Sequence, residues 1–127
     1  MAKEKLYIFD TTLRDGQQTQ GVDFSVQDKI IISEALDKFG LDYIEGGWPG
    51  ANPTDTKFFE SRPKLRNSKF TAFGMTKRAG RSADNDPQLR ALIDTNSDSI
   101  CLVAKTWDYH VDVALGVSLE ENLKSIE

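Results

Sequence analysis

Arg14 and Asp15 are the first residues in this sequence whose types and position could support chemistry. They come soon after the run Leu6-Tyr7-Ile8-Phe9, which is aromatic and β-branched and has the length of a strand. A guanidinium and a carboxylate just past a buried strand must be hydrated, paired or bound to a ligand. We therefore treat Arg14 and Asp15 as candidate site residues. The alternative is that they belong to an ordinary solvated loop.

A longer pattern around this pair resembles a known enzyme signature. Leu13-Arg14-Asp15-Gly16 is followed by Gln18 and, eleven residues later, by Lys29. This pattern is similar to that of the acyl-CoA condensing and cleaving family, which includes 2-isopropylmalate synthase, homocitrate synthase, citramalate synthase and hydroxymethylglutaryl-CoA lyase. The resemblance to the citramalate synthase branch continues along nearly the whole chain, in residues 24–26, 42–53, 72–74, 78–80 and 107–111.

The resemblance implies roles for individual residues. Asp15 would be a ligand of a divalent metal (Mg²⁺, Mn²⁺ or Zn²⁺), and Arg14 would stabilise the enolate or the polarised carbonyl. Glu45 would be a catalytic residue in the same pocket, with Gln18 as a nearby substrate-binding residue. His110 follows the fourth predicted strand and is a candidate to line the 2-oxo acid pocket, although a lone histidine on a helix is more often a structural hydrogen-bonding residue.

The metal site is incomplete in this sequence. The family completes it with a His-x-His pair from a later strand, whereas the sequence has one histidine, flanked by Tyr109 and Val111. One carboxylate does not hold a metal by itself, so we expect weak or undetectable metal binding by this chain. The chemistry itself is coherent, because a fixed guanidinium suits the oxyanion that develops when an acetyl thioester enolate attacks a 2-oxo acid.

Composition excludes several other classes of protein. The 127 residues are 39% hydrophobic and 28% charged, with a net charge of −4 and no clustered basic face, which argues against nucleic-acid binding. No stretch has the length of a membrane span, and the apolar run after the first five residues is too short for a signal peptide, so a cytoplasmic protein without a membrane partner is expected. Cys101 lies in an apolar run and is expected to be a buried small hydrophobe rather than a nucleophile.

Caps and apolar runs predict four strand–helix units. The expected strands are residues 6–9, 41–45, 70–74 and 99–104, and helices are expected after Ser25, Asn52 and Asp86, over residues 107–115, and after Ser118 in a capping box with Glu121. Glycines and a proline follow Glu45 and would end the second strand there. The first helix would bury an apolar face and end at Gly40; that face consists of Ile31, Ala35 and Phe39, with Ile32 and Leu36 beside them.

The order of these units predicts an α/β fold with parallel strands and right-handed crossovers. Either a small doubly wound sheet or the first half of a TIM (β/α)8 barrel, which normally needs ~250 residues, fits this pattern. The family resemblance implies the barrel, with residues 1–127 as the amino-terminal part of its catalytic domain. In such a half barrel, Ile8, Ile44, Ala72 and Leu102 are expected to lie on a poorly covered inner face, which predicts self-association into a homo-oligomer.

The resemblance implies that the parent protein is an acyltransferase that condenses acetyl-CoA with a small 2-oxo acid, and that this chain alone is inactive. The sequence around Trp48 favours pyruvate or 2-oxobutyrate over 2-oxoisovalerate, unless Trp48 packs outward. Alternatives are 2-isopropylmalate or homocitrate synthesis, a retro-Claisen lyase, or a non-catalytic βα module that self-associates. The missing metal ligands favour the last alternative, and the retained Arg14, Asp15 and Glu45 oppose it.

Overall fold

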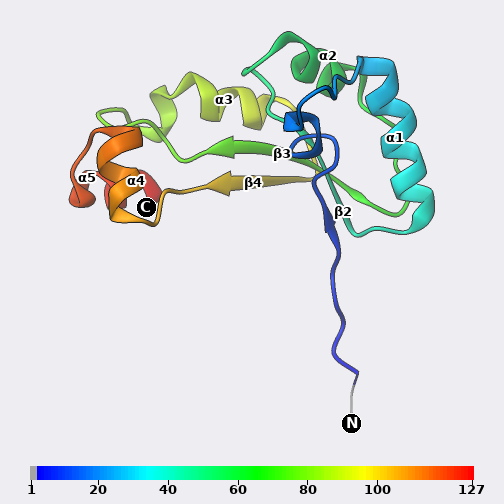
Figure 1. Ribbon diagram of the computed structural model, residues 1–127, viewed down its shortest axis with the longest axis horizontal. Coiled ribbons are helices and arrows are strands. Elements are labelled where there is room, and N and C mark those ends of the chain that lie inside the picture. Colours follow the sequence, from blue (N-terminus) through cyan, green and yellow to red (C-terminus); the bar gives the residue numbers. More distant parts are fainter. Residues whose placement is uncertain (1–2) are drawn as a thin grey trace.

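The computed structural model describes residues 3–127 and contains a parallel four-stranded sheet (Figure 1). The strands β1 (Phe9–Asp10), β2 (Tyr43–Gly47), β3 (Lys69–Met75) and β4 (Ser99–Val103) lie side by side in chain order, and every neighbouring pair is parallel. This confirms the four predicted parallel strands. Residues 1 and 2, which belong to the segment considered as a signal peptide, lie outside the described residues.

The larger helices cover one face of this sheet. Figure 1 shows α1 (Val26–Phe39), α2 (Pro53–Ser61) and α3 (Pro87–Asp94) on the same side, while α4 (Asp108–His110) and α5 (Leu119–Ile126) lie beyond the carboxyl end of β4. A doubly wound sheet carries helices on both faces and reverses its strand order, whereas a barrel adds strands in sequence under an outer ring of helices. The predicted half barrel is therefore the architecture that the structure has. None of the helices in residues 3–127 combines the length and the apolar character needed to cross a bilayer.

The core lies between the helices and the sheet and is rich in aromatic side chains. The rings of Phe59 and Phe70 stack with centroids 4.5 Å apart, and Phe58 meets Phe70 edge-on at 5.3 Å. The strands approach this cluster through glycines, because a Cβ on Gly46 would lie 2.4 Å from the Phe70 ring. The strand β2 includes both glycines and continues to Gly47, so the prediction that it ends at Glu45 was wrong.

The register of the strands corrects the predicted inner face. Ala72 pairs with Ile100 and Gly74 with Leu102, and Ile44 and Ala72 belong to the core under the helices. Both are fully buried, so they were wrongly placed on a poorly covered inner face. Successive side chains of a strand point to opposite faces of a sheet, so an error of one residue in the assignment moves a whole set of side chains to the wrong face. The opposite face carries Glu45, Thr71, Phe73 and Cys101.

The predicted apolar face of α1 is correct only in part, because Ile32 and Leu36 pack against the core while the helix also buries polar residues. Ile31 and Phe39 are 56% and 82% exposed, whereas Lys29, Ser33 and Asp37 are buried. Such residues can be buried because each has hydrogen-bonding partners. Asp37, for example, accepts three backbone N–H groups, from Arg66 at 2.9 Å, Asn67 at 2.8 Å and Ser68 at 2.7 Å. The predicted start of this helix after Ser25 is confirmed, with a capping box between Ser25 and Asp28, and so is its end at Gly40, which is left-handed.

Other element ends differ modestly from the predictions. β1 is shorter than expected because β2 begins only at Tyr43, so the residues before Ile8 have no strand beside them on that side. The helix expected over residues 107–115 is split into α4 and a π-helical segment, Val111–Leu115, that ends at Gly116. Ser118 caps α5 as expected, but the carboxylate of Glu121 accepts the N–H of Gly80 at 3.0 Å, so the capping box is only half formed.

Candidate active site

Arg14 and Glu45 form an ion pair just past β1 and within β2. The Nε group of Arg14 donates to Oε2 of Glu45 at 2.7 Å, and the two side chains are 19% and 1% exposed. The guanidinium carbon of Arg14 also lies 4.1 Å from the centroid of the Phe73 ring. A carboxylate on one edge and an aromatic face beneath thus fix the position and plane of this guanidinium.

The loop after β1 holds Arg14 by its backbone. The N–H groups of Arg14, Asp15 and Gly16 all point at the carbonyl oxygen of Thr11, at 3.2, 2.8 and 3.1 Å. The preceding residue, Leu13, is fully buried in the core. One tight turn therefore places Leu13 in the core and directs the neighbouring guanidinium of Arg14 away from it. This turn anchors the site to the core.

Asp15 and Gln18 lie near this pair but are more open to solvent. The Asp15 side chain is 60% exposed, and its Oδ1 is 3.4 Å from Nη1 of Arg14. Gln18 is exposed in the 3₁₀ turn Gly16–Gln18 and borders a small cavity of about 130 Å³ together with Arg14 and Trp48. The structure therefore brings Arg14, Asp15, Gln18 and Glu45 into one neighbourhood, while their roles stay predictions.

His110 does not join this group within the chain. It lies on α4, which Figure 1 shows at the end of the molecule away from the loop that carries Arg14. Its ring contacts its own neighbours, with centroids 4.6 Å from Trp107 and 6.3 Å from Tyr109. Its predicted part in substrate binding stays a prediction, and the residues that the structure brings together come from the loop after β1 and from β2.

Cys101 lies close to Glu45, which the sequence did not predict. It pairs with Phe73 across β3 and β4, on the face that also carries Glu45. Cys101 is half-buried rather than fully buried as expected. This burial raises the pKa of the Cys101 thiol and the charge of Glu45 acts in the same direction, while Arg14 opposes them. The thiol is therefore protonated at neutral pH, in keeping with the expectation that it is not a nucleophile. A correct assignment of the β4 side chains to the two faces of the sheet would have placed Cys101 on the face that carries Glu45.

Lys29 and Asp55 form a buried ion pair behind the candidate site. The Nζ group of Lys29, which is fully buried, donates to the Asp55 carboxylate and to the carbonyl oxygens of Leu13 at 2.9 Å and Gly46 at 3.1 Å. Asp55 also accepts the backbone N–H of Trp48 at 2.8 Å. Sequence reasoning used Lys29 only as part of a pattern and missed Asp55, whose available signal was an acidic residue in the first turn of a helix.

The donors in this chain do not make a metal site by themselves. Among residues 3–127, no three side chains of His, Cys, Asp or Glu lie close enough together to hold an ion. Asp15 instead has a guanidinium group beside it, whereas a divalent metal needs further oxygen or nitrogen ligands there. The residues present therefore do not fit a divalent ion, and Asp15 as a metal ligand stays a prediction.

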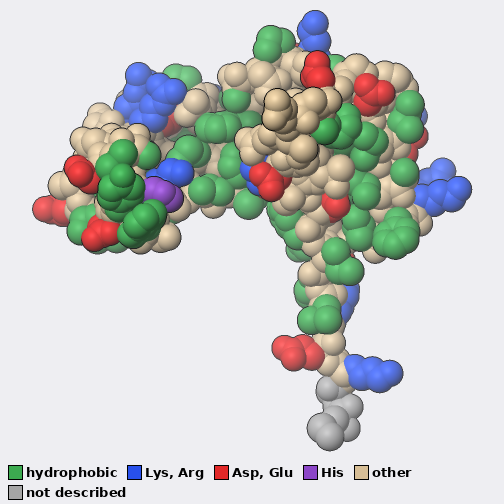
Figure 2. All heavy atoms as spheres, in the orientation of Figure 1, with side chains coloured by type: hydrophobic (Ala, Val, Ile, Leu, Met, Phe, Trp, Pro, Cys, Tyr) green, Lys and Arg blue, Asp and Glu red, His purple; other side chains and the backbone are tan. Residues whose placement is uncertain are grey.

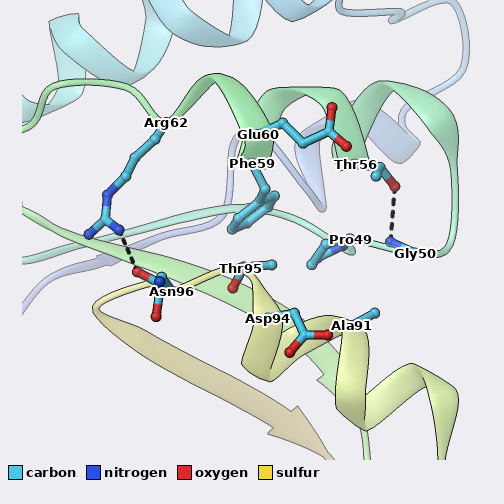
Figure 3. Close-up of a pocket in the computed structure, with 10 residues that line it drawn as sticks. All are labelled: Pro49, Gly50, Thr56, Phe59, Glu60, Arg62, Ala91, Asp94, Thr95 and Asn96. Atoms are coloured by element: carbon cyan, nitrogen blue, oxygen red, sulfur yellow. Dashed lines mark hydrogen bonds between the residues drawn. The ribbon is translucent and has the colours of Figure 1, made fainter.

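A larger cavity of about 480 Å³ lies elsewhere, between α2 and α3 (Figure 3). Arg62 reaches across one side of it to the carbonyl oxygen of Asn96 at 2.7 Å, and the Gly50 N–H donates to Thr56 at 3.0 Å on another. No residue predicted for the site lines this cavity. It belongs to the helical layer and is separate from the face that carries Arg14 and Glu45.

Comparisons with known sequences agree with this geometry. The HMGL-like family model matches residues 5–127. The (R)-citramalate synthase of Aquifex aeolicus is 52% identical over 125 residues, and that of Geobacter sulfurreducens is 50% identical over 128 residues. The 2-isopropylmalate synthase of Listeria innocua is 38% identical over 125 residues. These alignments cover 97–99% of this chain and 24% of each relative, so the chain spans about a quarter of the length of the curated relatives it matches.

Solved structures show the same fold. The HMG-CoA lyase of Bacillus subtilis superposes with a TM-score of 0.72 at 19% identity, covering 98% of this chain and 41% of that one. The hydroxymethylglutaryl-CoA lyase of Pseudomonas aeruginosa gives a TM-score of 0.72 at 20% identity, covering 96% and 40%. The match to the family model confirms the family predicted from the Leu13-Arg14-Asp15-Gly16 pattern, and the chain belongs to the HMGL-like family.

Proposed function

We propose that the protein containing this chain condenses acetyl-CoA with a short 2-oxo acid, as a citramalate synthase does. The observation that carries the proposal is the buried Arg14–Glu45 pair, with the guanidinium fixed against Phe73. A protein that only bound a partner would not need a pre-oriented guanidinium of this kind. The 52% identity to an (R)-citramalate synthase supports condensation in particular.

Arg14 is the residue to which we assign the stabilisation of charge. When the enolate of the acetyl thioester attacks the keto carbon, a carbon–carbon bond forms and the electron pair of the carbonyl moves to its oxygen. That oxygen later takes a proton, and hydrolysis of the thioester by water releases CoA. Because Glu45 accepts the Nε–H of Arg14 and Oδ1 of Asp15 lies 3.4 Å from Nη1, the Nη2 group remains to donate to the new oxyanion. Donors that are already oriented need no reorganisation during the reaction.

Glu45 is better described as a positioning residue than as the catalytic residue implied by the resemblance. It is 1% exposed, and one of its oxygens is committed to Arg14 at 2.7 Å. A buried carboxylate bonded in this way holds the planar guanidinium in one orientation. We assign to Glu45 the task of aiming Arg14.

Trp48 supports a preference for small substrates. Its ring meets Phe73 edge-on with centroids 5.5 Å apart, and it borders the same small cavity as Arg14 and Gln18. This packing against Phe73 supports a Trp48 ring that narrows the pocket over one that packs outward. We propose that pyruvate and 2-oxobutyrate are preferred over 2-oxoisovalerate, by ~1–3 kcal/mol for each extra methyl group.

The alternative within the family is 2-isopropylmalate synthesis, which the 38% identity to the Listeria innocua enzyme supports more weakly. The homo-oligomer and the cytoplasmic location expected from the sequence belong to the same proposal. Acetyl-CoA and the 2-oxo acid would be its small-molecule partners. Residues such as Ile100 and Leu102, which are 42% and 50% exposed, support an apolar contact outside this chain.

The test is a kinetic comparison on the full-length protein. Release of CoA is measured with acetyl-CoA saturating and pyruvate, 2-oxobutyrate or 2-oxoisovalerate varied, and each product is identified by mass spectrometry. A reaction without any 2-oxo acid controls for simple thioester hydrolysis. We expect kcat/KM to be highest for pyruvate or 2-oxobutyrate. Equal use of 2-oxoisovalerate would replace the proposal with 2-isopropylmalate synthesis, and no release with any acid would overturn both.

A further inference from the structure

We infer that Lys29 is a positioning residue that joins the backbone just before Arg14 to the backbone just after Glu45. Its ammonium donates to the carbonyl oxygen of Leu13 at 2.9 Å and to that of Gly46 at 3.1 Å. These two residues are the sequence neighbours of the ion pair. The kinetic consequences rest on the proposed function, whereas the contacts do not.

The need for such a link follows from how little sheet pairing precedes the site. β1 and β2 are paired only at Phe9 with Tyr43 and at Asp10 with Ile44. This ladder stops before it reaches Arg14 and Glu45, so ordinary strand hydrogen bonds do not fix the separation of their backbones. The buried ammonium of Lys29 bridges the chain at that point from α1.

Packing alone does not account for a lysine at this position. The side chain is fully buried, and burying an ammonium is costly unless it is paired and hydrogen-bonded. An apolar side chain of similar length would fill the space without this cost. What the ammonium adds is three donors, and its acceptors are the two backbone carbonyls and the Asp55 carboxylate.

Asp55 makes the burial of this charge possible and extends the link to a third segment. It lies in the first turn of α2 and is 4% exposed. Its Oδ2 accepts the backbone N–H of Trp48 at 2.8 Å and the side-chain amide of Asn52 at 2.9 Å. One buried pair therefore holds the loop after β1, the end of β2 and the residue that packs on Phe73, all of which border Arg14.

A matched pair of double variants of the full-length protein separates positioning from simple stability. Lys29→Met with Asp55→Asn removes both buried charges together, so neither is left unpaired, and it also removes every donor to the two carbonyls. Lys29→Gln with Asp55→Asn has nearly the same size and charge but keeps an N–H donor. Lys38→Met, on the exposed side of the last turn of α1, is the surface control.

We expect the Met variant to lose about 100-fold in kcat, because a displaced guanidinium no longer meets the oxyanion. The Gln variant should recover part of this, to a loss of about 10-fold, while Lys38→Met leaves kcat unchanged. The KM for acetyl-CoA should stay within about twofold in all three. Crystal structures should show the Arg14–Glu45 contact broken in the Met variant and retained in the Gln variant.

A mutant cycle with Arg14→Lys tests whether Lys29 acts through Arg14. If it does, the Met double variant costs less than about twofold in kcat when Arg14 is already replaced. Equal losses in the Met and Gln variants, multiplicative losses in the cycle, an intact Arg14–Glu45 contact in the Met variant, or failure of both variants to fold would overturn the inference. If wild-type protein releases no CoA, the proposed function fails, and the crystal structures still decide the role of Lys29.

Discussion

The region around β1 to β3 and the region around β4 differ in how far other residues of the chain cover their apolar side chains and pair their charges. Near β1 to β3, an apolar core lies under α1, α2 and α3 and the buried charges of Lys29, Glu45 and Asp55 are paired. Exposed apolar residues in this region lie on the outer side of α1, at Ile31 and Phe39, and in the segment that leads into β1. Around β4 and α5, in contrast, many apolar side chains are open to solvent. These are Ile100, Leu102, Leu119, Leu123 and Ile126, between 42% and 59% exposed, and Figure 2 shows hydrophobic atoms gathered at the α4–α5 end.

This difference indicates which part of the site the chain can build alone. The Arg14–Glu45 pair and its supports draw only on residues between β1 and β4 that are already in place. The apolar surface of β4 and α5 has no such internal partners among the described residues. Because this chain covers only 24% of the relatives, we expect that surface to be covered by further parts of the fold.

The largest effect is expected from Arg14→Lys in the full-length protein. An ammonium cannot reproduce the planar contacts of the guanidinium with Glu45 and the oxyanion, so kcat should fall by at least ~100-fold. Arg81→Lys, in the exposed loop after β3, is the matched control and should change kcat by less than about twofold. Steady-state kinetics with acetyl-CoA and pyruvate provide the measurement. Unchanged turnover would remove Arg14 from the mechanism.

The second prediction concerns the loss of unfolding free energy when an apolar side chain is truncated in each of the two regions. Phe58→Ala should lower the free energy of unfolding by ~3–5 kcal/mol, because Phe58 is fully buried. Leu123→Ala should cost less than ~0.5 kcal/mol in residues 1–127 alone, where Leu123 is 59% exposed. In the full-length protein it should cost ~2–5 kcal/mol if α5 is covered. Urea unfolding of both forms gives these values, and equal costs of Leu123→Ala in the two would break the comparison.

A third effect concerns acid. Burial alone would raise the pKa of Asp37, but the backbone N–H groups of Arg66, Ser68 and Asn67 outweigh it and lower the pKa. Because the folded pKa lies below the unfolded one, the stability gained is present above about pH 4 and is lost as pH falls further. Asp37→Asn should therefore weaken the fall in stability below pH 4. Asp23→Asn, at an exposed position, serves as the control, and identical acid profiles for the two variants would contradict the prediction.

The smallest effect is expected for metal binding by residues 1–127 alone. Asp15 has no group of further ligands near it among the described residues, so titration with Mn²⁺ should give little or no heat. The same titration of the full-length protein is the comparison. A tight stoichiometric site in the short chain would show that it contains a ligand set that neither the sequence nor the structure indicates.

The fold was predictable from the sequence because caps and apolar runs are local signals. The caps Ser25, Asn52 and Asp86 begin α1, α2 and α3 as expected, and the motif identified the family. The face assignments failed where tertiary contacts reversed a local pattern. α1 buries Lys29 and exposes Ile31, because the three acceptors of the Lys29 ammonium come from Leu13, Gly46 and Asp55, which lie far from it in the sequence.

The candidate site was predictable in part for the same reason. Arg14 and Glu45 meet because parallel strands end side by side, which the pattern implied. The contributions of Phe73, Cys101 and Asp55 depend on strand register and on a helix packed behind the sheet. The local signals for Cys101 and Asp55, strand alternation and an acidic residue in the first turn of a helix, do not show which distant residues they meet, so these contacts became visible only in the structure.

The two glycines after Glu45 restrict how this protein can evolve. A Cβ on Gly46 would collide with the Phe70 ring, and one on Gly47 would lie 2.5 Å from the Asp55 carboxylate. A substitution at either position must therefore disturb the aromatic core or the buried ion pair before it could reshape the pocket. Within this segment, single mutations that alter substrate choice are therefore expected at Trp48 and the residues after it. A saturation library across residues 46–51 should show intolerance at the first two positions and graded changes in selectivity beginning at the third.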